Sequence, residues 1–287
     1  MPIGCDLVLR RFDCSVAYSK FAQKQVKEYY GLETPMIPLG TETERFVPYD
    51  DKKIQELKKE WNLAGKFVVG VVARNQPRKF LDRTIKSFKL VAEKVPNAVL
   101  LMHCDPNDSA APFSLFNLIR RYNLENRVFF TGMNAYNSFD WDKMIDVYNI
   151  FDCFFLSTSG EGWGIPLVEA MSCEVPVVAT NYTTIQEIVV DNKAGFGAKL
   201  AGVDELNQFD YTSQQHDIIA SNGTLTGSWE VERGFCDVKD AADKIIKIAE
   251  DPKLAKELGK NGRKAAIKLY DQKLVNERWE KLMLSLL

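Results

Sequence analysis

Apolar and polar positions follow two different rhythms along this chain of 287 residues. Short, continuous apolar runs are typical of buried strands, and longer stretches in which apolar residues return every three or four positions are typical of amphipathic helices. The strand-like runs cover 16–19, 67–74, 98–103, 127–132, 152–158 and 175–180. The helix-like stretches cover 20–31, 79–95, 114–124, 139–150, 166–174 and most of 241–287.

This alternation predicts an α/β fold with a doubly wound, Rossmann-like parallel sheet covered by helices on both faces. One segment, 201–234, is polar and interrupts the alternation, so we expect an inserted loop or excursion there. The end of the chain, "QKLVNERWEKLMLSLL", places Trp279, Leu282, Met283, Leu286 and Leu287 at helical spacing. We expect this apolar face to fold back on the domain. The alternative is an exposed face that supports dimerisation or partner binding.

Composition removes several classes of function. The net charge is -2, with 37 basic and 39 acidic residues, which argues against nucleic acid as the main partner. The six cysteines are scattered without a C-x-x-C pair, a usage that suits a reducing cytosol. No apolar run approaches the ~20 residues that span a bilayer, and the opening "MPIGCDLVLRRFD" lacks the pattern of a signal peptide. We therefore expect a cytoplasmic protein.

The segment "STSGEGWGIPLVEAMSCEVPVVATN", residues 157–181, carries the most informative pattern. It predicts a strand end, a glycine-rich turn, a helix and a second strand. The ligand crevice of such a βαβ unit lies at the carboxyl ends of its strands. Amides at the start of the helix favour an anion, and Gly162 and Gly164 let the backbone approach a ligand closely. Neither the G-x-G-x-x-G fingerprint nor a P-loop is present, which disfavours an NAD-dependent oxidoreductase.

Two glutamates accompany this turn. Glu161 lies in the turn and Glu169 lies about one helical turn inside the helix, so both are expected to flank one crevice. A carboxylate accepts two hydroxyl hydrogen bonds, which suits a ribose or a sugar ring. The alternatives are a solvated helix residue for Glu169 and a partner of the helix dipole for Glu161.

A pair of cations is predicted at the same edge of the sheet. In "GVVARNQPRKF", Arg74 ends a strand and Lys79 begins a helix, where the two could hold a diphosphate and stabilise it as a leaving group. We interpret their neighbour Arg78 as a solvated loop residue. His103 is interpreted as a core or rim residue, and His216, in the polar insert, as solvated.

These residues resemble glycosyltransferase family 4. "GEGWGIPLVEAMSCEVPVVATN" resembles its E-x7-E segment, and "RNQPRK" its paired Arg and Lys. "IPLGTETERFVP" is similar to its interdomain connector, and "EDPKLAKELGKNGRKAA" to its C-terminal helices. The resemblance covers about residues 35–280 except the polar insert, and four ordered segments are far more specific than one motif.

The resemblance implies a GT-B architecture of two facing Rossmann-like domains, with retaining transfer from a nucleotide-sugar donor (UDP or GDP) and without a cofactor or metal. Arg74 and Lys79 would bind the donor diphosphate, Glu169 the ribose, and Glu161 the transferred sugar. The turn near Met133 would lie beside the base. The catalytic set is then Arg74, Lys79 and Glu161, and the remaining donor contacts come from Gly162, Trp163, Gly164 and Ile165.

The same resemblance divides the chain into three parts. Residues 1–40 correspond to a remnant of the N-terminal acceptor domain and the connector, 41–270 to the nucleotide-sugar-binding domain with its insert at 201–234, and 271–287 to a crossover helix. The chain is expected to supply the donor-binding half. A partner would provide the N-terminal domain, or the chain would form a homo-oligomer. The acceptor (a glycan, a lipid or a protein) is open, as is peripheral association with a membrane. The alternatives are a non-catalytic nucleotide-sugar-binding subunit and a nucleotide-sugar epimerase.

Overall fold

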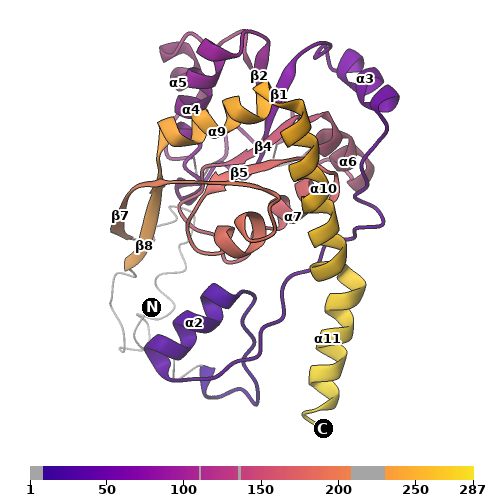
Figure 1. The fold of residues 1–287 in the computed structure, drawn as a ribbon. Helices are drawn as coiled ribbons and strands as arrows, with labels where there is room; N and C mark the ends of the chain where they lie inside the picture. The colour runs from indigo at the N-terminus through magenta and orange to yellow at the C-terminus, as the bar shows by residue number, and fades with distance from the viewer. Residues whose placement is uncertain (1–8, 110, 135–136, 208–229) are drawn as a thin grey trace.

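A parallel six-stranded sheet forms the centre of the protein (Figure 1). The computed structural model describes residues 9–109, 111–134, 137–207 and 230–287. The strand order is β3-β2-β1-β4-β5-β6. The strands are β1 (Phe67–Val72), β2 (Ala98–His103), β3 (Val128–Phe130), β4 (Cys153–Leu156), β5 (Val177–Thr180) and β6 (Gly195–Ala198). This topology confirms the predicted doubly wound, Rossmann-like fold.

Helices cover both faces of the sheet. Right-handed crossovers between parallel strands put α4 (Leu81–Lys94) and α5 (Leu115–Arg121) on one face and α6 (Trp141–Ile150) and α7 (Ile165–Ser172) on the other. α9 (Val238–Glu250) packs beside α4, whereas α10 (Pro252–Leu269) packs on α7. The remaining helical segments are α2 (Lys20–Tyr30), α3 (Asp51–Glu60), the 3₁₀ turn η1 (Pro77–Lys79), the π-helical turn η2 (Gln186–Val190) and α11 (Gln272–Leu284).

The sequence sets these elements locally. All six residues of β2, "AVLLMH", are buried, as a central strand of a covered parallel sheet requires. Five helices begin at an aspartate whose carboxylate accepts hydrogen bonds from amides of the first turn, a strong helix-start signal. These caps are Asp50 for α3, Asp140 for α6, Asp237 for α9, Asp251 for α10 and Asp271 for α11.

The strand order changes direction between β1 and β4. The chain runs from β1 outward to β2 and β3, then returns to β4 and runs outward to β5 and β6. The loops that follow β1 and β4 therefore leave the sheet side by side and in opposite directions, which opens a crevice at the carboxyl ends of the strands. The residues after β1, from Ala73, and the residues after β4, from Ser157, meet at this crevice.

The N-terminal segment lies below the sheet edge in Figure 1. The predicted strand at 16–19 is wrong, because its only β-pairing among the described residues is an isolated bridge between Ala17 and Met36. The part of the chain that the structure describes places no second strand beside this short apolar run, so it does not extend into a sheet there. The Glu187 carboxylate accepts a hydrogen bond from the Lys20 amide at 3.0 Å, which fixes the start of α2 to the π-helical turn η2.

The polar insert begins and ends as strands. β7 (Leu200–Asn207) and β8 (Glu230–Cys236) form a separate antiparallel pair, which the sequence pattern did not predict. The residues between them, including His216, lie outside the described residues. Several contacts connect β8 to the domain. Among them, the Gly234 amide donates to the Ser159 carbonyl at 3.0 Å, Arg83 donates to the Cys236 carbonyl at 2.6 Å, and Phe235 stacks on Phe80 with ring centroids 5.2 Å apart.

The C-terminal helix α11 points away from the sheet (Figure 1). Val275 is its only buried residue, and Met283 and Leu284 are 61% and 64% exposed. The expectation that this apolar face folds back on the domain is therefore wrong: α11 begins beyond Tyr270, where no further sheet surface lies beside it.

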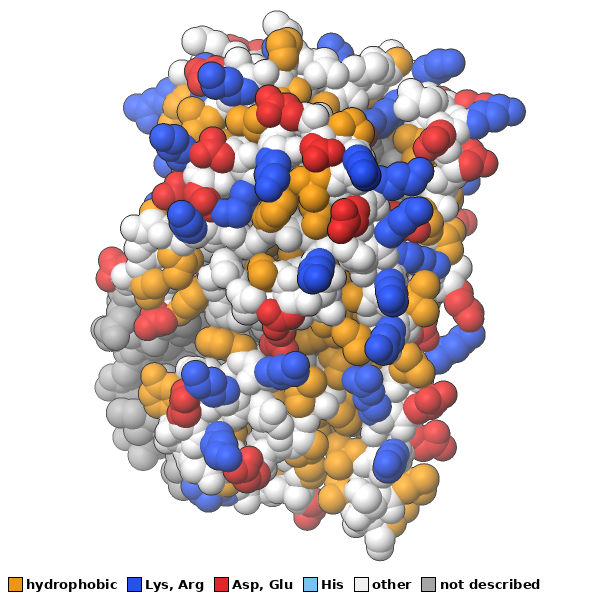
Figure 2. All heavy atoms as spheres, in the orientation of Figure 1, with side chains coloured by type: hydrophobic (Ala, Val, Ile, Leu, Met, Phe, Trp, Pro, Cys, Tyr) orange, Lys and Arg blue, Asp and Glu red, His pale blue; other side chains and the backbone are white. Residues whose placement is uncertain are grey.

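Figure 2 shows Lys and Arg side chains following α10 and α11. None of the described helices combines the length and the apolar character that a membrane span requires.

Arg263 of α10 joins the connector to α7. Its Nη1 contacts the carbonyls of Thr43, Phe46 and Ser172 at 2.8, 2.6 and 2.8 Å. We predict that Arg263→Ala lowers the free energy of unfolding by about 2–3 kcal/mol, because these part-buried carbonyls lose a charged donor. The neighbouring Lys264 is exposed, so Lys264→Ala should stay within about 0.5 kcal/mol of the wild type. Denaturant titration of both variants measures the difference, and equal losses would contradict this role of Arg263.

Candidate functional site

A cleft of about 1000 Å³ opens where the strand order reverses. Its walls come from the ends of β1, β2 and β3 and from the start of α7. They comprise Val72, Ala73, Arg74, Arg78, Lys79, His103, Asp105, Asn107, Asp108, Ser109, Met133, Asn134 and Pro166. Three of these residues, Arg74, Lys79 and Met133, were predicted from the sequence, so the structure brings part of the predicted site together.

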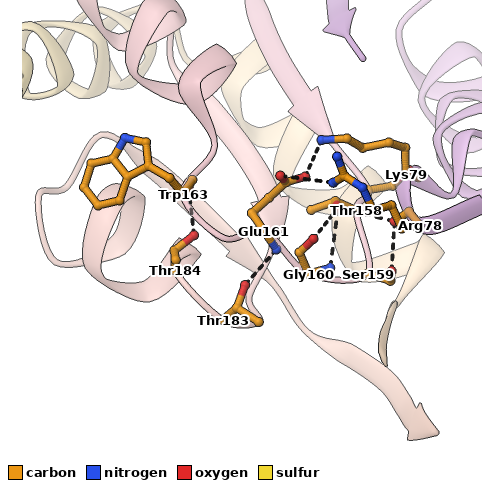
Figure 3. A network of polar contacts seen from close by, with 10 residues as sticks. Arg78, Lys79, Thr158, Ser159, Gly160, Glu161, Trp163, Thr183 and Thr184 are labelled. Carbon is orange, nitrogen blue, oxygen red and sulfur yellow. Dashed lines mark hydrogen bonds and ion pairs between the residues drawn. The ribbon is translucent and has the colours of Figure 1, made fainter. Parts of the chain in front are cut away.

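A buried ion pair lies at this cleft. The Lys79 Nζ is 2.5 Å from the Glu161 Oε1, and the two side chains are only 8% and 7% exposed. Burial lowers the pKa of the Lys79 ammonium, and the nearby Glu161 carboxylate opposes this shift. Figure 3 shows both groups pointing toward one another from η1 and from the turn after β4. The predicted phosphate-binding cation and the predicted sugar-binding carboxylate are thus partners of each other.

Arg78 takes part in the same cluster. Its Nη1 is 3.4 Å from the Glu161 Oε2, and its side chain is 34% exposed. The interpretation of Arg78 as a solvated loop residue is therefore wrong. The position of Arg78 directly before Lys79 is the signal that could have predicted its contact with Glu161. Both residues belong to one tight 3₁₀ turn, so both side chains can reach the same neighbouring loop.

Hydrogen bonds hold the turn after β4 in place. The Arg78 carbonyl accepts from the Ser159 amide at 2.8 Å and from the Ser159 hydroxyl at 2.9 Å. The Ser157 hydroxyl donates to the Phe80 carbonyl at 2.8 Å. On the other side, the Glu161 amide donates to the Thr183 hydroxyl at 2.9 Å. Hydrogen bonds from serine and threonine side chains thus fix the position of Glu161 in a turn that has no regular secondary structure.

The glycine-rich residues have separate roles. A Cβ at Gly162 would meet open space, so the backbone is accessible there, as predicted. Gly164 has φ of +104° and a Cβ there would lie 2.6 Å from Leu167, so it is required by the turn itself. The Trp163 ring is buried against Tyr270 and points away from Glu161 in Figure 3, which leaves only its backbone near the turn. Ile165, at the start of α7, is 42% exposed.

Arg74 lies at the cleft in an ion pair with Asp108. Its Nε is 2.6 Å from the Asp108 Oδ2, and its Nη2 is 3.1 Å from the Oδ1. This two-point contact fixes the plane of the guanidinium. Because the Arg74 side chain is 52% exposed, the pair is partly screened by solvent. The sequence reasoning identified Arg74 but not Asp108, which lies 34 residues away in the loop after β2.

Glu169 lies apart from the cleft walls. The Tyr148 hydroxyl donates to its Oε2 at 2.5 Å. Burial raises the pKa of the Glu169 carboxyl, and the hydrogen bond from Tyr148 partly opposes that shift. The structure excludes a solvated helix residue at this position, since the carboxyl is partly buried and hydrogen-bonded to α6. Its contact with a ribose stays a prediction.

His103 ends β2 at the cleft and is 8% exposed, which confirms the interpretation as a core or rim residue. Its Nδ1 is 2.9 Å from the Thr131 hydroxyl, and its ring lies 5.2 Å from that of Phe139. Burial lowers the pKa of His103 to about 4, so the imidazole is neutral near pH 7. Within the described residues, no cluster of three or more His, Cys, Asp or Glu side chains could hold a metal ion.

Comparison with known proteins shows which family this chain resembles. The family model described as "Glycosyl transferases group 1" matches residues 53–208. Mannosylfructose-phosphate synthase from Agrobacterium fabrum is 29% identical over 182 residues, which are 61% of this chain and 39% of the relative. The capsular polysaccharide biosynthesis glycosyltransferase CapM from Staphylococcus aureus is 27% identical over 245 residues, 85% of this chain and 51% of the relative. The matched regions thus span about half or less of these relatives.

Solved structures show the same fold. Sucrose-phosphate synthase from Thermosynechococcus elongatus superposes with a TM-score of 0.74 at 22% identity, over 98% of this chain and 60% of that chain. Alr3699/HepE from Anabaena, solved in complex with UDP and glucose, gives a TM-score of 0.74 at 20% identity, over 98% of this chain and 66% of that chain. At this identity the likeness establishes the fold, which is the C-terminal half of a GT-B architecture.

The buried His103 predicts a specific pH dependence. Because its pKa is about 4 in the folded protein and near 6.5 when unfolded, only the unfolded state takes up this proton between those values. The free energy of unfolding should therefore lose about 3 kcal/mol as the pH falls from 6.5 to 4, with no further loss below. Denaturant titrations of the wild type and His103→Gln across pH 4–8 isolate this contribution. Parallel curves for the two proteins would contradict it.

Proposed function

The chain belongs to the group 1 glycosyl transferases, and from that premise we propose that its cleft binds a nucleotide-diphosphate sugar. The protein then transfers the sugar to an acceptor hydroxyl, with retention of configuration at the anomeric carbon. Because the chain spans about half the length of the relatives, we propose that it supplies the donor-binding half of the active site.

One observation carries this proposal. Three cationic side chains, Arg74, Arg78 and Lys79, line a single cleft at the reversal point of a parallel sheet. Cations at such a point bind a diphosphate and stabilise the negative charge that develops when the nucleotide departs. The open backbone at Gly162 lies on the turn that carries Glu161, next to these cations.

The remaining roles follow from position. Lys79 and Arg74 bind the diphosphate, and for this Arg74 shares or exchanges its partner Asp108. Glu161 and the turn at Gly162–Ile165 contact the sugar, Glu169 accepts a hydrogen bond from a ribose hydroxyl, and Met133 lies beside the base. These roles need no metal, so transfer should persist in the presence of a chelator. The proposed setting is the cytoplasm. UDP and GDP are the first nucleotides to test, and Alr3699/HepE, which shares the fold, was solved with UDP.

Calorimetry with UDP- and GDP-sugars, followed by a transfer assay, tests the function directly. Binding with release of free nucleotide in the presence of an acceptor supports transfer. Binding without turnover supports the alternative, a non-catalytic donor-binding subunit. An isomerised donor would identify an epimerase. If the wild type binds neither class of nucleotide sugar, the proposed function is wrong.

Lys79 should dominate affinity for the nucleotide. We predict that Lys79→Ala weakens binding of UDP or GDP at least tenfold, since a hydrogen bond between charged groups contributes roughly 1.5–3 kcal/mol. Lys86 pairs with Asp82 on the exposed face of α4 and provides the matched control, so Lys86→Ala should bind like the wild type. Calorimetry measures both, with melting temperatures recorded in parallel. Unchanged affinity in a folded Lys79→Ala protein would exclude this lysine from the phosphate site.

Glu169 can be tested through the sugar of the nucleotide. If Glu169 accepts hydrogen bonds from ribose hydroxyls, Glu169→Ala should weaken binding of a ribonucleoside diphosphate roughly tenfold, as expected for a hydrogen bond to a charged group. Binding of the 2′-deoxy analogue should change less, because that ligand already lacks one of the two hydroxyls. An equal loss for both nucleotides would indicate that Glu169 acts through its packing with Tyr148 instead.

A further inference from the structure

The carboxylate of Glu161 has two cationic partners, one on each oxygen. Lys79 lies 2.5 Å from Oε1, and Arg78 lies 3.4 Å from Oε2. Lys79 and Glu161 alone would form a neutral, buried pair. With Arg78 the cluster carries one net positive charge, and Arg78 is the member with the greater exposure, at 34% of its side chain. Figure 3 shows both cations reaching the carboxylate from the same turn, η1.

A diphosphate that enters the cleft must compete with Glu161 for Lys79. If Lys79 were the only partner of Glu161, its departure would leave a buried carboxylate without a counter-charge, which is strongly unfavourable. Arg78 removes this obstacle, because its guanidinium contacts the other oxygen of the same carboxylate. Its fork of donors can also hold a carboxylate at two points, which a lysine cannot do.

We propose that Arg78 is a positioning residue that holds Glu161 in place while Lys79 transfers its contact to the diphosphate of the donor. The inference rests on the proposed function and adds a third cation to the predicted pair of Arg74 and Lys79. Donor binding is then an exchange of ion-pair partners. Glu161 stays in contact with a cation, and oriented for the hydroxyls of the sugar, throughout the exchange.

The backbone around Arg78 supports this role. The Arg78 carbonyl accepts hydrogen bonds from the Ser159 amide and hydroxyl, at 2.8 and 2.9 Å, and from the Thr158 hydroxyl at 3.3 Å. These bonds fix the main chain of Arg78 to the turn that carries Glu161, whichever side chain is present. A substitution at Arg78 therefore changes the charge next to Glu161 while the loops stay joined.

A double-mutant cycle separates this role from direct phosphate binding. The four proteins are the wild type, Arg78→Gln, Glu161→Gln and the double variant, and the probe is UDP or GDP, whichever the wild type binds. A nucleotide without the sugar is used because Glu161 is proposed to contact only the sugar. We expect Arg78→Gln to weaken binding roughly tenfold, since Lys79 then stays with Glu161. In the Glu161→Gln background, the same change should alter affinity less than about twofold, because no carboxylate needs the arginine.

Two further variants sharpen the result. Arg78→Lys should recover part of the lost affinity because it restores the charge but not the two-point geometry. Arg120 is exposed on α5, so Arg120→Gln controls for the removal of one positive charge from the surface and should bind like the wild type. The melting temperature of Arg78→Gln should stay close to that of the wild type, because its backbone anchors are kept.

Each remaining outcome overturns the inference. An equal loss on both backgrounds means that Arg78 contacts the nucleotide directly. No loss on the wild-type background means that Arg78 has no part in the exchange. In both cases binding by the wild type leaves the proposed function standing. If the wild type binds neither UDP nor GDP, the proposed function fails and the inference fails with it.

Discussion

The ion pair between Lys79 and Glu161 joins the two loops on which the cleft depends. The residues are 82 positions apart in the sequence, and they meet because β1 and β4 are neighbours at the centre of the sheet. That neighbourhood in turn requires Gly70, since a Cβ there would lie 2.1 Å from the Phe151 ring. A single glycine in β1 thus permits the strand contact that brings the buried charges together.

Burying two charges is costly unless geometry and hydrogen bonds compensate. Here, hydrogen bonds within and between the two loops help to offset the cost of burying Lys79 and Glu161. Ser157 and Ser159 tie the turn after β4 to the main chain of η1, and Thr183 holds the Glu161 amide. The turn is therefore fixed before any ligand arrives. Such preorganisation lets charged groups act on a ligand without first being reoriented.

Periodicity along the sequence was sufficient for most of the sheet, because β1, β2, β4 and β5 are continuous apolar runs that are buried in its centre, and β3 is a short apolar run at its edge. Periodicity did not predict the elements whose structure depends on contacts with residues far away in the sequence. β6, "GFGA", has two glycines and no branched residue, so nothing local marks it as a strand. The strands β7 and β8 pair across a polar insert. The exposure of α11 depends on how much surface lies beside it, a property that no local pattern contains.

The same limit explains the site. Residue type and position in the motif identified Arg74, Lys79, Glu161 and the accessible backbone at Gly162. The partners of these side chains lie in other loops: Asp108 follows β2, and Thr183 follows β5. The sequence therefore predicted charged groups that contact only the ligand. In the structure they already have protein partners: Arg74 pairs with Asp108, Lys79 with Glu161, and Glu169 accepts a hydrogen bond from Tyr148.

Because these groups are already paired, the net free energy of ligand binding depends on an exchange of partners. A ligand that replaces one partner by another gains only the difference between two favourable contacts, which is smaller than the gross strength of either contact. If the cleft binds a nucleotide diphosphate, the charges that hold it have partners to return to when it leaves. The cost of leaving a buried charge uncompensated, which would oppose product release, is then avoided. A site built from paired charges is therefore suited to repeated binding and release, provided that one cation, such as Arg78, can hold each carboxylate during the exchange.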